Sequence, residues 1–249
     1  MRLINGDCIE EMNNLIDEDV KVDLVLTDLP YGTTQCKWDS IIPFEPMWDC
    51  VNQLTNERTP CVFFGNEPFS SRLRLSNLNN YKYDIIWDKI VRSGFLNANR
   101  QPLRQYENII VFYKKQCVYN VIKWEGDEPC HPHKTRKPST ANVYNPVTSQ
   151  NAVMTKWKFP TNIYQCNSQK NECNNTKRVH PTQKPVALLE YLIKTYSNEG
   201  DTVLDFTMGS GSTGVACRNT NRDFIGIELD EEYYNIAKKR IFDNQARLI

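Results

Sequence analysis

The chain has 249 residues, of which 40% are hydrophobic and 24% charged, and its formal net charge is zero. This length fits one large domain or one domain with a small insertion, and the composition is that of an ordinary globular protein. No run of about 18 apolar residues occurs, so no membrane span is predicted. The first twelve residues carry acidic side chains and no long apolar run, which argues against a secretion signal and predicts an intracellular, cytoplasmic protein.

The nine cysteines are scattered along the chain, and their odd number suits reduced thiols in an intracellular protein. Cys130, His131 and His133, followed by Cys166 and Cys173, are residue types that bind zinc. Structural zinc sites use close ligand pairs, and the sequence contains no Cys-x-x-Cys. No metal site is therefore predicted.

Short apolar runs that end at turn residues predict strands in the N-terminal part of the chain. These strands are expected at 2–7, 22–27, 61–65, 83–87 and 107–113, with a helix over 8–15. The strand at 22–27 leads directly into Asp28-Leu29-Pro30-Tyr31-Gly32, where proline and glycine stop it.

The stretch from 114 to 178 differs from the rest because it is rich in Asn, Pro, Thr, Lys and Gln and has weak periodicity. We expect an insertion or small recognition region here, outside the core. Between Lys114 and Lys184 there are twelve basic and four acidic residues, so the remainder of the chain is net acidic. A basic segment on an acidic body can face phosphates, although a solvated loop region explains the same charges.

Regular structure is expected again from residue 185. Apolar residues on one face predict a helix over 185–197, and strands at 202–206 and 223–228 alternate with helices after Gly214 and over 231–242. Strands alternating with helices predict an α/β fold with a mostly parallel central sheet.

The glycines of Gly209-x-Gly211-x-x-Gly214 follow a predicted strand and open a helix. Such a turn lets a cofactor approach the backbone, and Glu228, at the end of the next strand, can accept hydrogen bonds from ribose hydroxyls. NAD and S-adenosylmethionine both carry an adenosine, and a tight turn without a ligand is the other reading. No lysine follows the glycines, which excludes a Walker loop. The loop also lies late in the chain, whereas a dinucleotide fold starts with it.

Asp28-Leu29-Pro30-Tyr31 is expected at the carboxyl end of a strand, where open α/β sheets carry their sites. The Asp28 carboxylate and the Leu29 carbonyl could accept the two N–H groups of an aromatic amine and favour a nucleophilic nitrogen. Pro30 would stiffen the turn, and Tyr31 could stack on a base drawn out of a duplex. A plain strand-ending turn is the alternative.

With these motifs the sequence resembles the beta class of DNA amino-methyltransferases, in which the catalytic motif precedes the cofactor loop. Further similarity lies in 180–185 (His-Pro-Thr-Gln-Lys-Pro), in 63–69 and in 87–112. The resemblance implies a Rossmann-like, S-adenosylmethionine-dependent methyltransferase fold in circularly permuted order, with helices on both faces of the sheet. It implies that the catalytic residues are Asp28, Leu29, Pro30 and Tyr31.

The resemblance also implies a set of cofactor contacts. Lys184 would pair with the carboxylate of S-adenosylmethionine, Asp7 and Cys8 would contact its adenine, and Glu228 its ribose. The remaining cofactor-binding residues would be His180, Thr182, Asp205, Phe206, Thr207, Gly209 and Gly211. The sequence departs from the family at Leu29, where proline is usual, and at Phe206 and Thr207, where the family has Pro-Phe.

The expected activity is methyl transfer to N6 of adenine in double-stranded DNA, as in restriction–modification systems. In the family that the sequence resembles, aspartate at the position of Asp28 is commoner in adenine enzymes, so the resemblance favours adenine over N4 of cytosine. An RNA methyltransferase and a non-catalytic module of the same fold remain alternatives, whereas carbon-5 methylation needs a Pro-Cys-Gln context that is absent.

Catalysis, DNA recognition and cofactor binding are expected to fall on three segments of the chain. Residues 1–113 would form the catalytic half, 114–178 a target-recognition insertion and 179–249 the cofactor half of one domain, in a monomer or homodimer. Trp157 is expected to pack rather than read bases. Phosphate contacts are expected from Lys134, Arg136, Lys137, Lys156, Lys158, Lys177 and Arg178.

Overall fold

The computed structural model describes residues 1–32, 40–130, 155–167 and 183–242. Contacts divide the chain into two compact units, a large one formed by Met1–Asn120 with Asn162–Ile249 and a small one formed by Val121–Thr161. The small unit lies inside the predicted recognition insertion, whose role stays a prediction.

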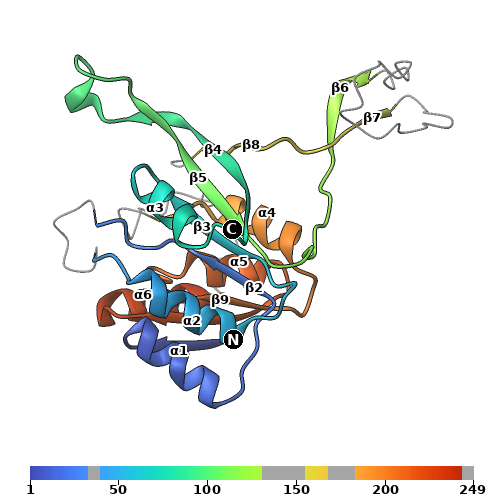
Figure 1. Ribbon diagram of the computed structural model, residues 1–249. Coiled ribbons are helices and arrows are strands. Elements are labelled where there is room, and N and C mark those ends of the chain that lie inside the picture. The colour runs from blue at the N-terminus through green and yellow to red at the C-terminus, as the bar shows by residue number, and fades with distance from the viewer. Residues whose placement is uncertain (33–39, 131–154, 168–182, 243–249) are drawn as a thin grey trace. The chain divides into compact units, whose positions relative to one another are not determined.

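The large unit is built on an eight-stranded sheet in the order β1-β10-β9-β2-β3-β5-β4-β8 (Figure 1). The first five strands in this spatial order, β1, β10, β9, β2 and β3, pair in parallel. Strand β5 runs antiparallel to β3 and β4, and β8 is parallel to β4. The predicted mostly parallel sheet is therefore confirmed. In spatial order its strands are β1 Arg2–Asn5, β10 Asp223–Glu228, β9 Thr202–Asp205, β2 Leu24–Thr27, β3 Cys61–Gly65, β5 Arg104–Phe112, β4 Tyr81–Ser93 and β8 Ile163–Gln165.

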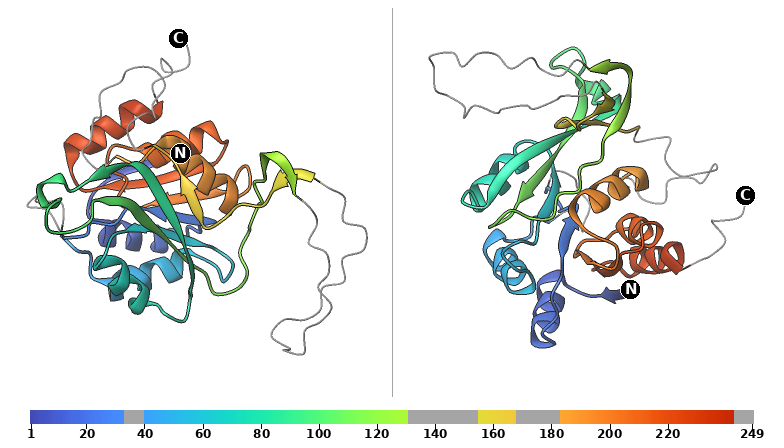
Figure 2. Two further views of the ribbon diagram at one scale, coloured as in Figure 1. Left: turned by 90° about the horizontal axis from the view of Figure 1, so that it is seen from above. Right: turned by 90° about the vertical axis from the view of Figure 1, so that its right-hand side faces the viewer.

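Helices cover both faces of this sheet, as predicted (Figure 2). Successive strand residues point to opposite faces, so Leu24 and Leu26 pack with one helical layer and Val25 with the other. The helices packed with Val25 are α1 Cys8–Asp17, α2 Phe44–Leu54 and α3 Phe69–Ser76. Those packed with Leu24 and Leu26 are α4 Val186–Tyr196, α5 Ser212–Asn219 and α6 Glu231–Phe242.

Some elements differ from the sequence-based expectation. Helices α2 and α3 were not predicted, although Met47, Trp48 and Val51 mark one buried face of α2. The stretch 114–178, expected outside the core, contributes the β8 strand and two buried thiols, Cys117 and Cys166.

Strand β4 is much longer than predicted and β5 begins three residues earlier than predicted, and the two form a hairpin that extends beyond the sheet (Figure 1). A short 3₁₀ helix, Phe95–Asn97, lies at its tip. Phe95 and Leu96 are fully or largely exposed there, so this end of the hairpin has no core contact of its own.

The small unit contains two antiparallel strands, β6 Trp124–Cys130 and β7 Thr155–Lys158. The Lys158 ammonium lies 5.0 Å from the centroid of the Trp124 ring, and that of Lys123 lies 4.7 Å from the Phe159 ring. Trp157, which was expected to pack, is 52% exposed.

Candidate active site

Three carboxylates from distant parts of the sequence gather at the carboxyl edge of the sheet. Asp205 is the last residue of β9, Glu228 the last of β10, and Asp28 follows the end of β2. Because β10, β9 and β2 are adjacent and parallel, their ends lie side by side. This edge is where open α/β sheets bind ligands.

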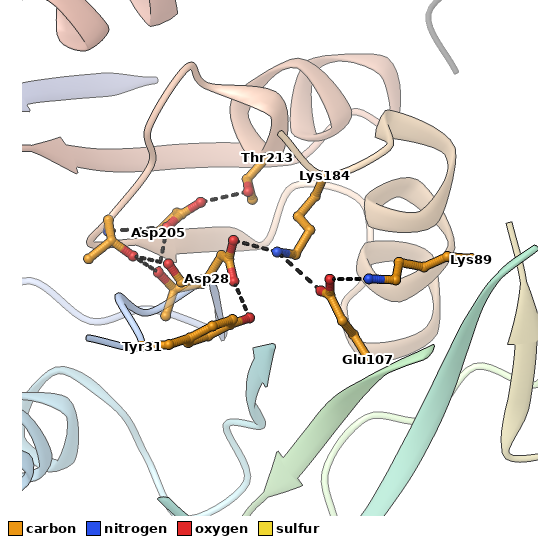
Figure 3. Close-up of polar contacts among 9 residues, drawn as sticks. Asp28, Tyr31, Lys89, Glu107, Lys184, Asp205 and Thr213 are labelled. Carbon is orange, nitrogen blue, oxygen red and sulfur yellow. Dashed lines mark hydrogen bonds and ion pairs between the residues drawn. The ribbon is translucent and has the colours of Figure 1, made fainter. Parts of the chain in front are cut away.

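Asp28 lies at one end of a row of alternating charges (Figure 3). Lys184, just before α4, places its Nζ 2.5 Å from Asp28 Oδ2 and 3.3 Å from Glu107 Oε2. Lys89 on β4 donates to the other oxygen of Glu107, on β5, at 2.9 Å. The Tyr31 hydroxyl donates to Asp28 Oδ1 at 2.8 Å.

These charges shift one another's ionisation. Burial raises the pKa of Asp28, although Lys184 acts in the opposite direction. Burial alone would lower the pKa of Lys184, but the carboxylates of Asp28 and Glu107 outweigh it and raise that pKa. Burial alone would raise the pKa of Glu107, but Lys184 and Lys89 outweigh it and lower that pKa. Lys184 and Glu107 are therefore held in their charged forms.

Hydroxyl groups join β2 to the glycine loop after β9. Thr27 and Thr213 each donate to a different oxygen of Asp205 at 2.6 Å, and the Thr207 hydroxyl donates to the Asp28 carbonyl at 3.0 Å. Burial raises the pKa of Asp205 to about 6, against these hydrogen bonds. The loop after β2 and the loop after β9 are thus fixed to each other.

The glycine loop has the backbone that its sequence predicts. Gly209 has a φ of 52°, and a Cβ built there would meet no atom within 4 Å, so open space lies beside it. Gly211 has a φ of 80°, and a Cβ there would lie 2.8 Å from that of Ala237 on α6. Glu228 accepts from the N–H groups of Gly209 and Asp230 at 2.8 and 2.9 Å, and burial raises its pKa.

The other predicted site residues occupy varied places. Asp7 caps α1 by accepting from the N–H groups of Ile9 and Glu10 at 2.9 and 3.2 Å. Cys8 beside it is half-buried, and burial raises its pKa to about 12. The side chains of Leu29 and Phe206 are buried in the core, and Pro30 is partly buried. His180 and Thr182 lie outside the described residues.

Sequence reasoning gave no role to several residues of this site. Lys89 reaches Glu107, which in turn pairs with Lys184, only because β4 and β5 pair in one register, with Trp87 opposite Glu107. Thr27 and Thr213 were not singled out either. Their signal is position, since Thr27 ends the strand before Asp28 and Thr213 lies inside the glycine loop.

The described residues hold neither a metal-binding cluster nor a membrane-spanning helix. Within the described ranges, no three His, Cys, Asp or Glu side chains are grouped so that they could hold a metal ion. His131, His133 and Cys173 fall outside those ranges. No described helix is both long and apolar enough to cross a membrane.

Comparisons with known proteins agree on one family. The family model N6_N4_Mtase, described as DNA methylase, matches residues 22–239. The Type II methyltransferase M.HpaI of Haemophilus parainfluenzae is 29% identical, over 96% of this chain and 74% of its own. The DNA adenine methyltransferase YhdJ of Escherichia coli K12 is also 29% identical, over 96% of this chain and 82% of its own. The crystal structure of the M1.HpyAVI–SAM complex is 27% identical with a TM-score of 0.64, over 96% of this chain and 98% of its own.

Proposed function

The chain belongs to the DNA methylase family, and from that premise we propose that it transfers a methyl group from S-adenosylmethionine to N6 of adenine in double-stranded DNA. The observation that carries the proposal is the direct link between Asp28 and the glycine loop through Thr207, which brings an amine-orienting carboxylate to the cofactor loop. The name of the Escherichia coli relative, a DNA adenine methyltransferase, favours adenine.

The residues around the glycine loop suit an adenosine-containing methyl donor. Open space lies beside Gly209, and each oxygen of Glu228 accepts one backbone N–H. An ionised carboxylate has about four acceptor positions, so Glu228 can still accept from two ribose hydroxyls. S-adenosylmethionine supplies an electrophilic methyl group on a positively charged sulfur. Asp205 and Glu228 provide negative charge on this side of the site.

The residues after β2 orient the acceptor. The Asp28 carboxylate and the Leu29 carbonyl accept the two N–H groups of the adenine amine, so that its lone pair points at the methyl group. The nitrogen–carbon bond forms as the carbon–sulfur bond breaks, sulfur keeps the electron pair, and the nitrogen then loses one proton. A carboxylate whose pKa burial has raised, as at Asp28, is a suitable acceptor for that proton. Alignment is the main contribution to the rate.

Tyr31 supports a flipped-base mechanism by its position. Its hydroxyl is bonded to Asp28, and its ring packs 5.0 Å from the ring of Phe69. The aromatic side chain therefore borders the place where the adenine amine would be held, and it can stack on a base that has left the duplex.

The projecting hairpin of β4 and β5 adds a surface suited to DNA. From residue 90 to 106 it carries Arg92, Arg100 and Arg104 and no acidic residue, and all three arginines are exposed. Arginines on an exposed hairpin can contact phosphates, which supports a nucleic acid as the substrate. Of the predicted basic contacts outside the hairpin, Lys156 and Lys158 are described and exposed or partly so. Lys134, Arg136, Lys137, Lys177 and Arg178 lie outside the described residues.

The test is methyl transfer from labelled S-adenosylmethionine to unmethylated duplex DNA, followed by digestion to nucleosides. We expect N6-methyladenine from the native protein and a loss of at least about a thousandfold in Asp28→Ala, since the variant loses the group that orients the amine. Asp49→Ala, which removes an exposed carboxylate on α2, is the matched control and should keep full activity.

Other products would change the proposal in defined ways. N4-methylcytosine would keep the mechanism and overturn the choice of base. Transfer to RNA but not to DNA would overturn the substrate. No transfer to varied genomic DNAs, with S-adenosylmethionine still bound, would favour a non-catalytic module.

A further inference from the structure

Two members of the charged row, Lys89 and Glu107, have no part in the chemistry described above. Glu107 approaches Asp28 only through Lys184, and Lys89 lies one step further away, on β4 (Figure 3). Their side chains are nevertheless well enclosed, with exposed fractions of 15% for Lys89 and 12% for Glu107. A buried ion pair adds little stability compared with well-packed apolar residues, so packing alone does not explain this one.

The row is arranged so that one ammonium serves two carboxylates. Lys184 Nζ lies 2.5 Å from Asp28 and 3.3 Å from Glu107, and it also lies 5.0 Å from the centroid of the Phe64 ring. Glu107 is held back from Asp28, because Lys89 donates to its other oxygen at 2.9 Å and its backbone is paired with Trp87 of β4. Glu107 is thus a fixed second anchor for the ammonium.

The second anchor matters because Asp28 must bind a new donor during the reaction. A lysine that paired with Asp28 alone would hold that carboxylate tightly and compete with the adenine amine. A lysine that is shared still favours the ionised form of Asp28 while leaving that carboxylate free to accept another N–H group. Opposite charges within about 4–6 Å favour the ionised carboxylate, and like charges oppose it.

We propose that Glu107, anchored by Lys89, is a positioning residue that holds the Lys184 ammonium between two carboxylates and so leaves Asp28 able to accept the target amine. This rests on the proposed function only for the identity of the amine. The arrangement of charges itself can be measured without any substrate.

Several charged or titratable groups face Asp28 from the elements packed around it. Lys184 lies before α4, Glu107 on β5, Tyr31 in the loop after β2 and Asp205 at the end of β9. Lys184 and the Tyr31 hydroxyl lower the pKa of Asp28, whereas burial and Glu107 raise it. Removing the Glu107 charge should therefore lower the pKa of Asp28, and removing the Lys89 charge should raise it, because Glu107 then draws Lys184 toward itself.

The test is a carbon-13 NMR titration of labelled aspartate carboxyls, with the Asp28 signal assigned by its loss in Asp28→Asn. We expect the pKa of Asp28 to fall in Glu107→Gln and to rise in Lys89→Met. In the double variant the effect of Lys89→Met should vanish, because its partner is gone. Glu57→Gln, which breaks the exposed pair with Lys115, should leave the pKa of Asp28 unchanged.

Kinetics give the second readout. In Glu107→Gln we expect kcat to fall by about ten- to a hundredfold, and the acid limb of the pH profile of kcat to move to lower pH. The Kd for S-adenosylmethionine, measured by calorimetry, should stay within about threefold of the native value. Glu107→Asp keeps the charge, so it should leave the acid limb nearer its native position.

An unchanged pKa of Asp28 in folded Glu107→Gln would overturn the proposal even if the native protein methylates DNA. The expected shifts in a protein that methylates nothing would leave the electrostatic arrangement standing and remove the proposed function instead.

Discussion

Asp205 and Glu228, at the ends of β9 and β10, accept hydrogen bonds from hydroxyl and backbone N–H groups, whereas Asp28 and Glu107 are held by the ammonium groups of lysines. A neutral donor forms a hydrogen bond with a carboxylate but leaves its negative charge in place. An ammonium group forms the hydrogen bond and also neutralises the charge. The half of the edge with the glycine loop therefore keeps negative charge, which suits a cationic methyl donor. The half beside β5 is neutralised, which suits an uncharged amine.

The largest effect should come from removing the cation shared by two carboxylates. Lys184→Met leaves Asp28 and Glu107 facing each other without Lys184, and we expect a loss of about 3–5 kcal/mol in the free energy of unfolding, measured with denaturant at pH 7. Lys115→Met, which breaks an exposed pair with Glu57, should cost nothing measurable. Equal losses in the two variants would mean that the buried ammonium of Lys184 stabilises the β5 half of the edge no more than an exposed ion pair does.

A pH-dependent effect should mark the half of the edge with the glycine loop, which contains Asp205. The pKa of Asp205 is raised from 3.8 to about 6, so between these values the folded protein keeps a proton that the unfolded chain has lost. This contribution makes the folded state less stable as pH rises from about 4 to 6, by about 3 kcal/mol in total. Asp205→Asn should lack it. The difference between native and variant unfolding free energies, measured at several pH values, tests this, with the exposed Asp49→Asn as the control that should follow the native curve.

A smaller effect should follow the loss of one neutral donor. Thr213→Val removes a hydroxyl that donates to Asp205 at 2.6 Å and is 5% exposed, so we expect a loss of about 1–2 kcal/mol in denaturant unfolding. The pKa of Asp205 should rise further, since that hydrogen bond lowers it. Ser71→Ala removes a similar hydroxyl–carboxylate bond, to Glu67, at the surface and should cost less. A larger loss for Ser71→Ala would contradict the role of burial here.

The sequence predicts the order of the sheet's main elements because strand and turn signals are local. Asp28 follows one apolar run and Gly209 follows another. If the two strands pair in parallel, these positions place both loops at the carboxyl edge of the sheet. The long hairpin of β4 and β5 could not be predicted in the same way, since its outer half has no core to impose alternation. Helix α3 has only eight residues, too few for a clear period.

The partners of individual charges depend on register, which a sequence does not state. Lys184 was expected to face the cofactor, and here it forms ion pairs with Asp28 and Glu107. Its expected cofactor role stays a prediction. Glu107 lies opposite Trp87, and Lys89 follows two residues later on the same strand, so a one-residue slip of β4 against β5 would separate them.

The pairing of β2 with β9 joins parts of the chain that are synthesised far apart in time. Thr27 and Asp205 are bonded across a separation of 178 residues, and all four residues of β2 are buried. At about 5–20 residues per second, a ribosome needs roughly 10–40 s to make the intervening chain. During that time one edge of β2 has no partner, so a nascent chain would expose an apolar strand edge to aggregation or to a chaperone. Closing so long a loop also makes the sheet a slow-folding one.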